Sequence, residues 1–163
     1  RGVYGDASAS LAFILIVFSL PDSDAAITMV RLLTITTSGQ GLHEITADVN
    51  GAVRASGVHD GLCTLFIRHT SASLLIQENA DPAVRADLEH WLGRLVPEND
   101  ALYTHLDEGP DEMPAHIKAM LTATSLSIPI SDGRLALGRW QGVFVWEHRH
   151  GGGRREIALH LGG

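Results

Sequence analysis

The sequence predicts an α+β protein, a compact and β-sandwich-like antiparallel sheet with two main helices, formed by one domain of residues 29–163. Short stretches rich in β-branched and apolar residues lie between turn signals in both halves of the chain, as expected for strands. The two main helices are flanked by strands without a regular β-α alternation, which favours an antiparallel sheet. The chain has 163 residues, 45% of them apolar and 19% charged, enough for one core without disulfides.

The first half of the domain predicts strands around one helical segment. From Met29, MVRLLTITTSG is rich in β-branched residues and ends in a Ser-Gly turn signal, which predicts a strand. Within residues 43–58, apolar side chains recur at helical spacing before Gly57, a typical helix stop. Residues 61–68, GLCTLFIR, predict a buried strand, and residues 74–79, LLIQEN, continue in extended conformation.

The second half predicts the two main helices, a long loop and further strands. Asp81 can cap a helix whose first turn contains Pro82, and its apolar stripe ends before the next proline. Residues 97–114 predict a long loop, and long loops in compact domains are often functional. Pro114 opens a second helix. Strands follow in LSIPI, in RLALGRWQGVFVWEH after an Asp-Gly turn, and in EIALHL.

The N-terminal segment, residues 1–28, predicts an extension outside the domain. Its apolar run at residues 11–20 is shorter than the about 20 residues that span a bilayer. The run has the length of a signal-peptide core, but Arg1 is the only basic residue before it. A cleaved leader is therefore the alternative interpretation.

Charge and cysteine content narrow the classes of partner. The formal net charge of -7 argues against a nucleic-acid-binding protein, which needs a dense basic surface. No membrane partner is expected either. Cys63 is the single cysteine, so it excludes an intramolecular disulfide and is compatible with a reducing compartment. We therefore expect a cytoplasmic protein.

Three histidines lie where functional sites usually form. His69 ends a predicted strand, His105 lies in the long loop, and His116 lies in the first turn of a helix. Three imidazoles and a water would suit a divalent metal ion such as zinc. Each histidine alone could instead be a surface or core residue. Nearby acids could orient a histidine or bind magnesium, namely Glu78, Asp81, Asp107, Glu108, Asp111 and Glu112.

A phosphate site is the second candidate. Thr70, Ser71 and Ser73 could present hydroxyls and N–H groups to phosphate oxygens, or could form an ordinary polar strand end. The segment GGGRR allows close backbone approach, and Arg154 or Arg155 could pair with phosphate, although a solvated hairpin loop has the same composition. Glu147 follows an apolar run and is a candidate for a shifted pKa.

The motifs HTSASL, ENADP, DEMPAHIKA, LGRWQG and EHRHGGGRR, in this order, resemble the YjbQ family. The likeness runs from about Met29 to the C-terminus. The resemblance implies a compact α+β fold that assembles as a homotrimer with sites near the subunit interfaces. It also implies a thiamine-phosphate synthase activity, which joins hydroxymethylpyrimidine diphosphate to thiazole phosphate and releases pyrophosphate. Two departures from the family pattern are Arg139, in place of a small hydroxyl residue, and a shorter EHRHGGGRR loop.

The resemblance also implies roles for single residues. His69, Glu147 and His148 would be catalytic, and His69, His105 and His116 would bind a divalent metal, zinc or magnesium. A small phosphorylated metabolite would be bound by Ser71, Ser73, Asn79, Gln141 and Arg154. Glu78 and Trp140 belong to the matching motifs. The alternatives are a non-catalytic trimer that binds a metal or a phosphorylated metabolite, and a metal-dependent phosphohydrolase.

Overall fold

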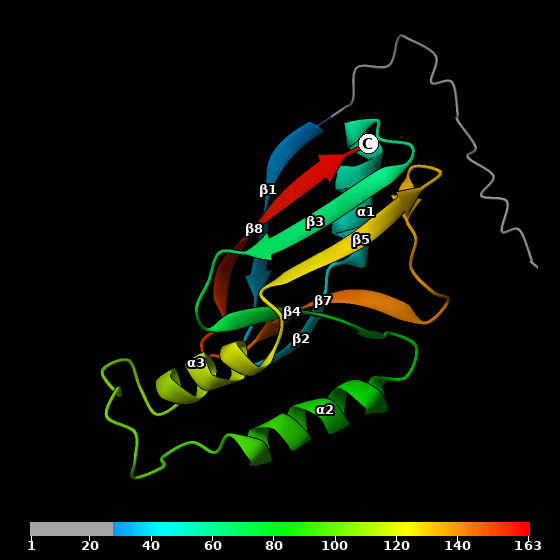
Figure 1. Cartoon of the computed structure of the whole chain (residues 1–163). Helices are drawn as coiled ribbons and strands as arrows, with labels where there is room; N and C mark the ends of the chain where they lie inside the picture. Colours follow the sequence, from blue (N-terminus) through cyan, green and yellow to red (C-terminus); the bar gives the residue numbers. More distant parts are fainter. Residues whose placement is uncertain (1–27) are drawn as a thin grey trace, which may run out of the picture.

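Two antiparallel sheets form the centre of the protein in the computed structural model, which describes residues 28–163 (Figure 1). The five-stranded sheet has the order β1-β8-β3-β5-β6 and the three-stranded sheet the order β2-β7-β4. The strands are β1 (Thr28–Thr37), β2 (Gly41–Glu44), β3 (Gly61–Ile67), β4 (Ala72–Glu78), β5 (Ser125–Ser131), β6 (Arg134–Leu135), β7 (Gln141–Glu147) and β8 (Gly153–Gly162). The antiparallel α+β fold predicted from the sequence is confirmed.

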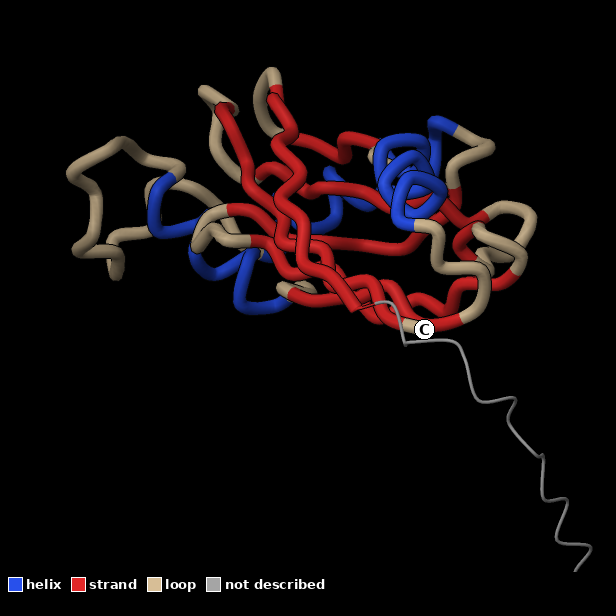
Figure 2. The backbone as a smooth tube through the Cα atoms, turned by 90° about the horizontal axis from the view of Figure 1, so that it is seen from above, coloured by secondary structure: helices blue, strands red, loops and turns tan. Residues whose placement is uncertain are grey.

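Three helices accompany the sheets where two main helices were predicted: α1 (Thr46–Ser56), α2 (Pro82–Leu95) and α3 (Glu112–Leu121). The helical spacing before Gly57 is confirmed as α1, and Gly57 ends it in the left-handed conformation, with φ of 78°. Asp81 caps α2 as predicted, because its Oδ1 accepts the N–H of Ala83 at 2.8 Å. Figure 2 shows the helices outside the stacked strands. None of the helices within residues 28–163 is long and apolar enough to cross a membrane.

Three segments differ from the predicted elements. β2 was not predicted, because it is a four-residue strand defined by its pairing with β7. The segment predicted as one strand over residues 134–148 contains two, β6 and β7, and they belong to different sheets. α3 begins at Glu112, and Pro114 lies within its first turn, where its missing N–H is tolerated. The predicted extension lies outside the described residues, apart from Thr28 in β1.

Strand β7 lies between two hydrophobic cores. Val143 and Val145 pack into the larger core, which lies between the two sheets and α1. Phe144 and Trp146 pack into a smaller core with α2. This alternation follows from the two-residue repeat of a strand, whose successive side chains point to opposite faces. The residues that follow Trp146 therefore begin between two packed layers.

Cys63 lies in the larger core and is fully buried, as its apolar surroundings predicted. Burial raises the pKa of its thiol to about 11. At pH 8 roughly one thiol in a thousand is then a thiolate, the reactive form. We expect Ellman's reagent at pH 8 to leave the folded protein almost unmodified and to modify one thiol in 6 M guanidinium. Rapid modification of the native protein would contradict the burial.

Candidate functional site

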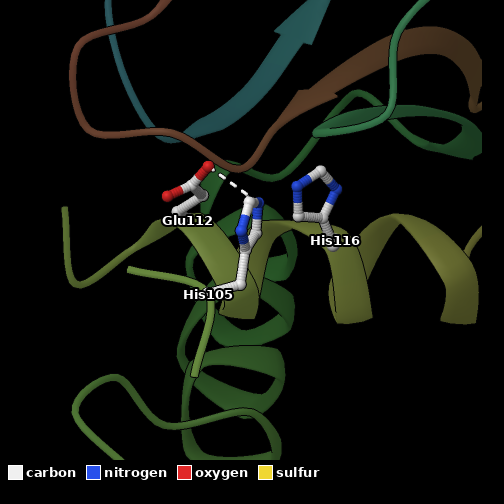
Figure 3. A group of neighbouring side chains, drawn as sticks. All are labelled: His105, Glu112 and His116. Atoms are coloured by element: carbon white, nitrogen blue, oxygen red, sulfur yellow. Dashed lines mark ion pairs between the residues drawn. The ribbon is translucent and has the colours of Figure 1, made fainter. Parts of the chain in front are cut away.

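Two histidines and a glutamate meet at the start of α3 (Figure 3). Glu112 and His116 are four residues apart and lie on one side of the helix, and His105 reaches them from the preceding loop. His105 Nε2 lies 2.8 Å from Glu112 Oε1, and the centroids of the two imidazole rings are 5.4 Å apart. One ligand atom from each residue lies within 4.8 Å of the others. The three residues thus form a candidate metal site.

Hydrogen bonds hold two of these side chains in place. Glu112 Oε2 accepts the N–H of Glu108 at 2.7 Å. His116 Nδ1 lies 3.1 Å from the carbonyl oxygen of Thr70. Because a carbonyl oxygen only accepts, Nδ1 carries the proton, and Nε2 of the neutral imidazole keeps its lone pair for a metal ion. An outer hydrogen bond of this kind is usual for metal-binding histidines.

The donor set fits zinc better than magnesium. Two histidines and a glutamate, with water in the fourth position, are a common set for catalytic zinc, whereas magnesium prefers oxygen ligands. Around a tetrahedral ion with bonds of about 2.0–2.1 Å, ligand atoms lie roughly 3.4 Å apart. The observed separations therefore require small side-chain movements, and the half-exposed His105 has room to make them.

His69 lies outside this group of three, although it was predicted as a metal ligand. Its Nδ1 accepts the N–H of Ser71 at 3.0 Å, so Nε2 of the neutral ring carries the proton. Burial, followed by the positive charge of Arg155, lowers the pKa of His69 and favours this neutral form. The ring is thus arranged to donate a hydrogen bond through Nε2. Metal binding by His69 stays a prediction.

Glu147 is buried, with 1% of its surface exposed, and its carboxylate accepts three hydrogen bonds. Thr37 Oγ1 and Arg155 Nε donate to Oε2 at 2.7 Å and 2.6 Å, and the N–H of Arg149 donates to Oε1 at 3.0 Å. Burial alone would raise the pKa of Glu147, but these bonds outweigh it and hold the pKa below its usual value. The carboxylate therefore stays ionised and positions its neighbours.

His148 is also buried, and its Nε2 lies 3.0 Å from Ser73 Oγ. Burial, with a smaller effect from the positive charge of Lys118, lowers the pKa of His148 to about 3. The imidazole is therefore neutral near pH 7. The carbonyl oxygen of Ser71 accepts the N–H of His148 at 3.3 Å. Five predicted site residues thus gather at one end of the three-stranded sheet: His69, Ser71, Ser73, Glu147 and His148.

The other predicted phosphate-binding residues lie apart from this cluster within the chain. Asn79 directly follows β4 and Gln141 begins β7, so both lie at the end of the sheet opposite the cluster. The two ends are six residues, or about 20 Å, apart along the strands. Asn79 Nδ2 donates to Glu44 Oε1 at 3.0 Å, and Gln141 Oε1 accepts the N–H of Gly138 at 2.8 Å. Arg154 is exposed on β8. One chain therefore does not bring together all five residues predicted to bind phosphate, namely Ser71, Ser73, Asn79, Gln141 and Arg154.

Sequence reasoning gave no separate role to two residues of this region. Glu112 was one of six candidate acids, because the predicted helix began at Pro114; with α3 beginning at Glu112, its spacing of four residues places it on the same side of the helix as His116. Lys118 is the only lysine of the chain, which was a signal in itself. It is 7% exposed, and burial lowers its pKa.

A depression of about 460 Å³ adjoins the metal candidate through Thr70, whose carbonyl oxygen binds His116. Its lining is mostly apolar and consists of Phe66, Ile67, Arg68, His69, Thr70 and Thr124. Its volume lies within the range of about 300–1,000 Å³ that is common for ligand sites. The depression is thus a candidate substrate site beside the three metal-binding candidates.

Comparisons with known proteins agree with the motifs and the fold. Residues 31–163 match the family model described as UPF0047 protein YjbQ-like. A UPF0047 protein of Synechocystis sp. is 54% identical over 133 residues, which cover 82% of this chain and 90% of that protein. YjbQ of Escherichia coli O157:H7 is 45% identical over 134 residues, covering 81% and 96%. The crystal structure of a conserved hypothetical protein from Thermus thermophilus is similar with a TM-score of 0.72 and 37% identity, covering 80% and 98%. The chain belongs to the YjbQ (UPF0047) family.

Proposed function

We propose that this protein is a metal-dependent enzyme of thiamine-phosphate synthase type, which joins hydroxymethylpyrimidine diphosphate to thiazole phosphate and releases pyrophosphate. The observation that carries the proposal is the group His105, Glu112 and His116 beside a depression large enough for a metabolite. A divalent ion, most suitably zinc, would supply positive charge to the leaving diphosphate. The family resemblance supplies the substrate class.

The chain's own residues have defined roles in this proposal. His69 lines the depression, and its Nε2–H would donate a hydrogen bond to a substrate oxygen there. Thr70 holds His116 in the tautomer that binds metal. Glu147 keeps the buried Arg155 in place. These contacts would position a substrate oxygen, the metal ligand His116 and the positive charge of Arg155 for a reaction in which negative charge develops on the leaving diphosphate.

Two alternatives have observations in their favour. Two histidines and a glutamate also hold zinc in hydrolases, where the bound water is the nucleophile, so a phosphohydrolase uses the same set. Glu147 and His148 are occupied by internal hydrogen bonds, which favours a non-catalytic protein that binds a metal or a phosphorylated metabolite. In one preparation, the synthase would form thiamine phosphate, the phosphohydrolase would release phosphate from simple monoesters, and the binding protein would form no product.

A homotrimer in the cytoplasm belongs to the same proposal. Exposed apolar side chains support assembly, because Trp91, Leu95 and Leu121 each expose more than half of their surface beside edge strand β4. Surfaces of this kind often mark protein contacts. Residues of a neighbouring subunit would then complete the phosphate site, whose predicted residues lie apart within one chain.

The decisive experiment combines metal analysis with an activity assay on zinc-loaded protein. We expect His116→Ala to weaken zinc binding by at least the 10–100-fold that changes in outer-shell partners cost. Thiamine phosphate formation from the two substrates should fall in parallel. His160→Ala is the matched control, because this histidine is exposed on β8. Competition with a chelator measures zinc affinity.

Each outcome separates the hypotheses. Thiamine phosphate formation that His116→Ala leaves unchanged would overturn the catalytic assignment. Zinc binding without product favours the binding protein, and phosphate release from p-nitrophenyl phosphate favours the phosphohydrolase. Absence of zinc binding in the unsubstituted protein would remove the metal site.

A further inference from the structure

The only lysine of the chain faces a pocket separate from the metal candidate. The pocket has a volume of about 280 Å³ and lies between α2, α3 and the three-stranded sheet. Its polar lining consists of Gln40, Glu89, His90, Lys118, Glu147 and His148. On a helix, two residues correspond to a rotation of about 200°, so Lys118 lies on the opposite side of α3 from His116. The pocket is thus distinct from the group at the start of α3.

Among residues 28–163, no acceptor forms a hydrogen bond with the Lys118 ammonium, and no carboxylate lies within 4.0 Å of it. The residue is nevertheless buried, with only 7% of its surface exposed. That part of the chain also contains no sealed side-chain nitrogen or oxygen without a partner. Nζ must therefore reach the open space of the pocket. No group within residues 28–163 pairs with this ammonium at the pocket, so the arrangement suits a negative ligand.

The neighbouring groups do not satisfy the ammonium. His148 is turned to Ser73 through Nε2, and Glu147 is paired with Arg155. Glu89 Oε1 accepts the N–H of Leu42 at 2.8 Å. Glu98 and Asp111, whose negative charges act on Lys118, pair directly with His150 and Arg149. These carboxylates already have partners, and none of them contacts Lys118.

We propose that this pocket binds a small anion, a carboxylate or phosphate group, through the Lys118 ammonium. Its volume lies just below the range of about 300–1,000 Å³ for ligand pockets, which suits a small metabolite or a single anionic group. An ammonium is a compact charge with three donors, well suited to such a group. The Trp146 ring gives the pocket an apolar wall.

The single lysine makes a direct test available. In protein labelled with ¹⁵N and ¹³C, the lysine side chain gives one Nζ signal by NMR. We expect inorganic phosphate or acetate, added to chelator-treated protein at fixed pH, to shift this signal saturably. Chloride at the same ionic strength should not. A response to phosphate alone or to acetate alone identifies the preferred group and supports the site in either case.

Three variants are expected to weaken, strengthen or leave unchanged the binding of the anion. Lys118→Met should weaken binding of the effective anion by at least roughly tenfold, about 1.4 kcal/mol, measured by calorimetry. Glu89→Gln should strengthen it, because it removes a negative charge from the pocket lining. Arg94→Met, at an exposed position of α2, is the matched cationic control and should have no effect.

Two results would overturn the proposal. One is an Nζ signal that neither anion shifts saturably, and the other is unchanged anion affinity in folded Lys118→Met. Should that variant fail to fold, the Nζ signal of the unsubstituted protein still decides the question.

Discussion

Replacing Glu147 with glutamine is expected to destabilise the protein by about 3–5 kcal/mol, the usual cost of removing one partner of a buried ion pair. Glu147 is 1% exposed, and Arg155 Nε donates to it at 2.6 Å. The substitution leaves the guanidinium buried without its counter-charge and weakens the bond from Thr37. Urea denaturation at pH 7, followed by circular dichroism, measures the change in the free energy of unfolding.

The matched control for this substitution is Glu156→Gln. Glu156 pairs with Arg68 at 2.8 Å, but both side chains are about half exposed. Exposed pairs contribute about 0–1 kcal/mol, so the control should change stability little. Similar losses in the two variants would show that burial does not set the strength of the Glu147 pair. Replacing both Glu147 and Arg155 with apolar residues should recover much of the lost stability.

Acidification from pH 7 to pH 5 is expected to remove about 2 kcal/mol of stability through His148 alone. The unfolded side chain has a pKa of 6.5, whereas burial and the charge of Lys118 lower the folded value to about 3. A lowered folded pKa means that the stabilisation is complete above 6.5 and is lost as the pH falls toward 3. The neutral ring then takes up its proton more readily in the unfolded state than beside Ser73 and Lys118.

The variant His148→Gln isolates this effect. Glutamine can still bond to Ser73 but does not titrate, so the loss of stability between pH 7 and pH 5 should shrink by about 2 kcal/mol. His69 also has a lowered pKa and contributes in the same direction in both proteins. Urea midpoints at the two pH values measure the difference. Equal pH dependence of variant and parent would contradict a strongly lowered pKa for His148.

Local signals predicted most of the fold. Asp81 and Pro82 begin α2 because a cap and a fixed φ act within a few residues, and Gly57 ends α1 for a similar reason. β2 could not be predicted, because its four residues become a strand only by pairing with β7, about a hundred residues later. The break between β6 and β7 depends on which sheet each strand joins, and that is decided by long-range packing.

Two of the three residues of the metal candidate, His105 and His116, were named from the sequence. Glu112 is recognisable as their neighbour only once α3 is known to begin there. Asn79 and Gln141 carry suitable side chains, but antiparallel register places them at the far end of the sheet. Motif order along the chain does not reveal that separation.

The alternation along β7 also constrains how this family can accept insertions and deletions. Glu147 shares the face of Val143 and Val145 and meets Arg155, whereas His148 continues the face of Phe144 and Trp146 and lies near Lys118. One residue inserted into β7 would exchange the two faces, turning the carboxylate toward the lysine and the imidazole toward the arginine. Two residues would restore the faces. The parity of this strand's length thus decides which charge meets which.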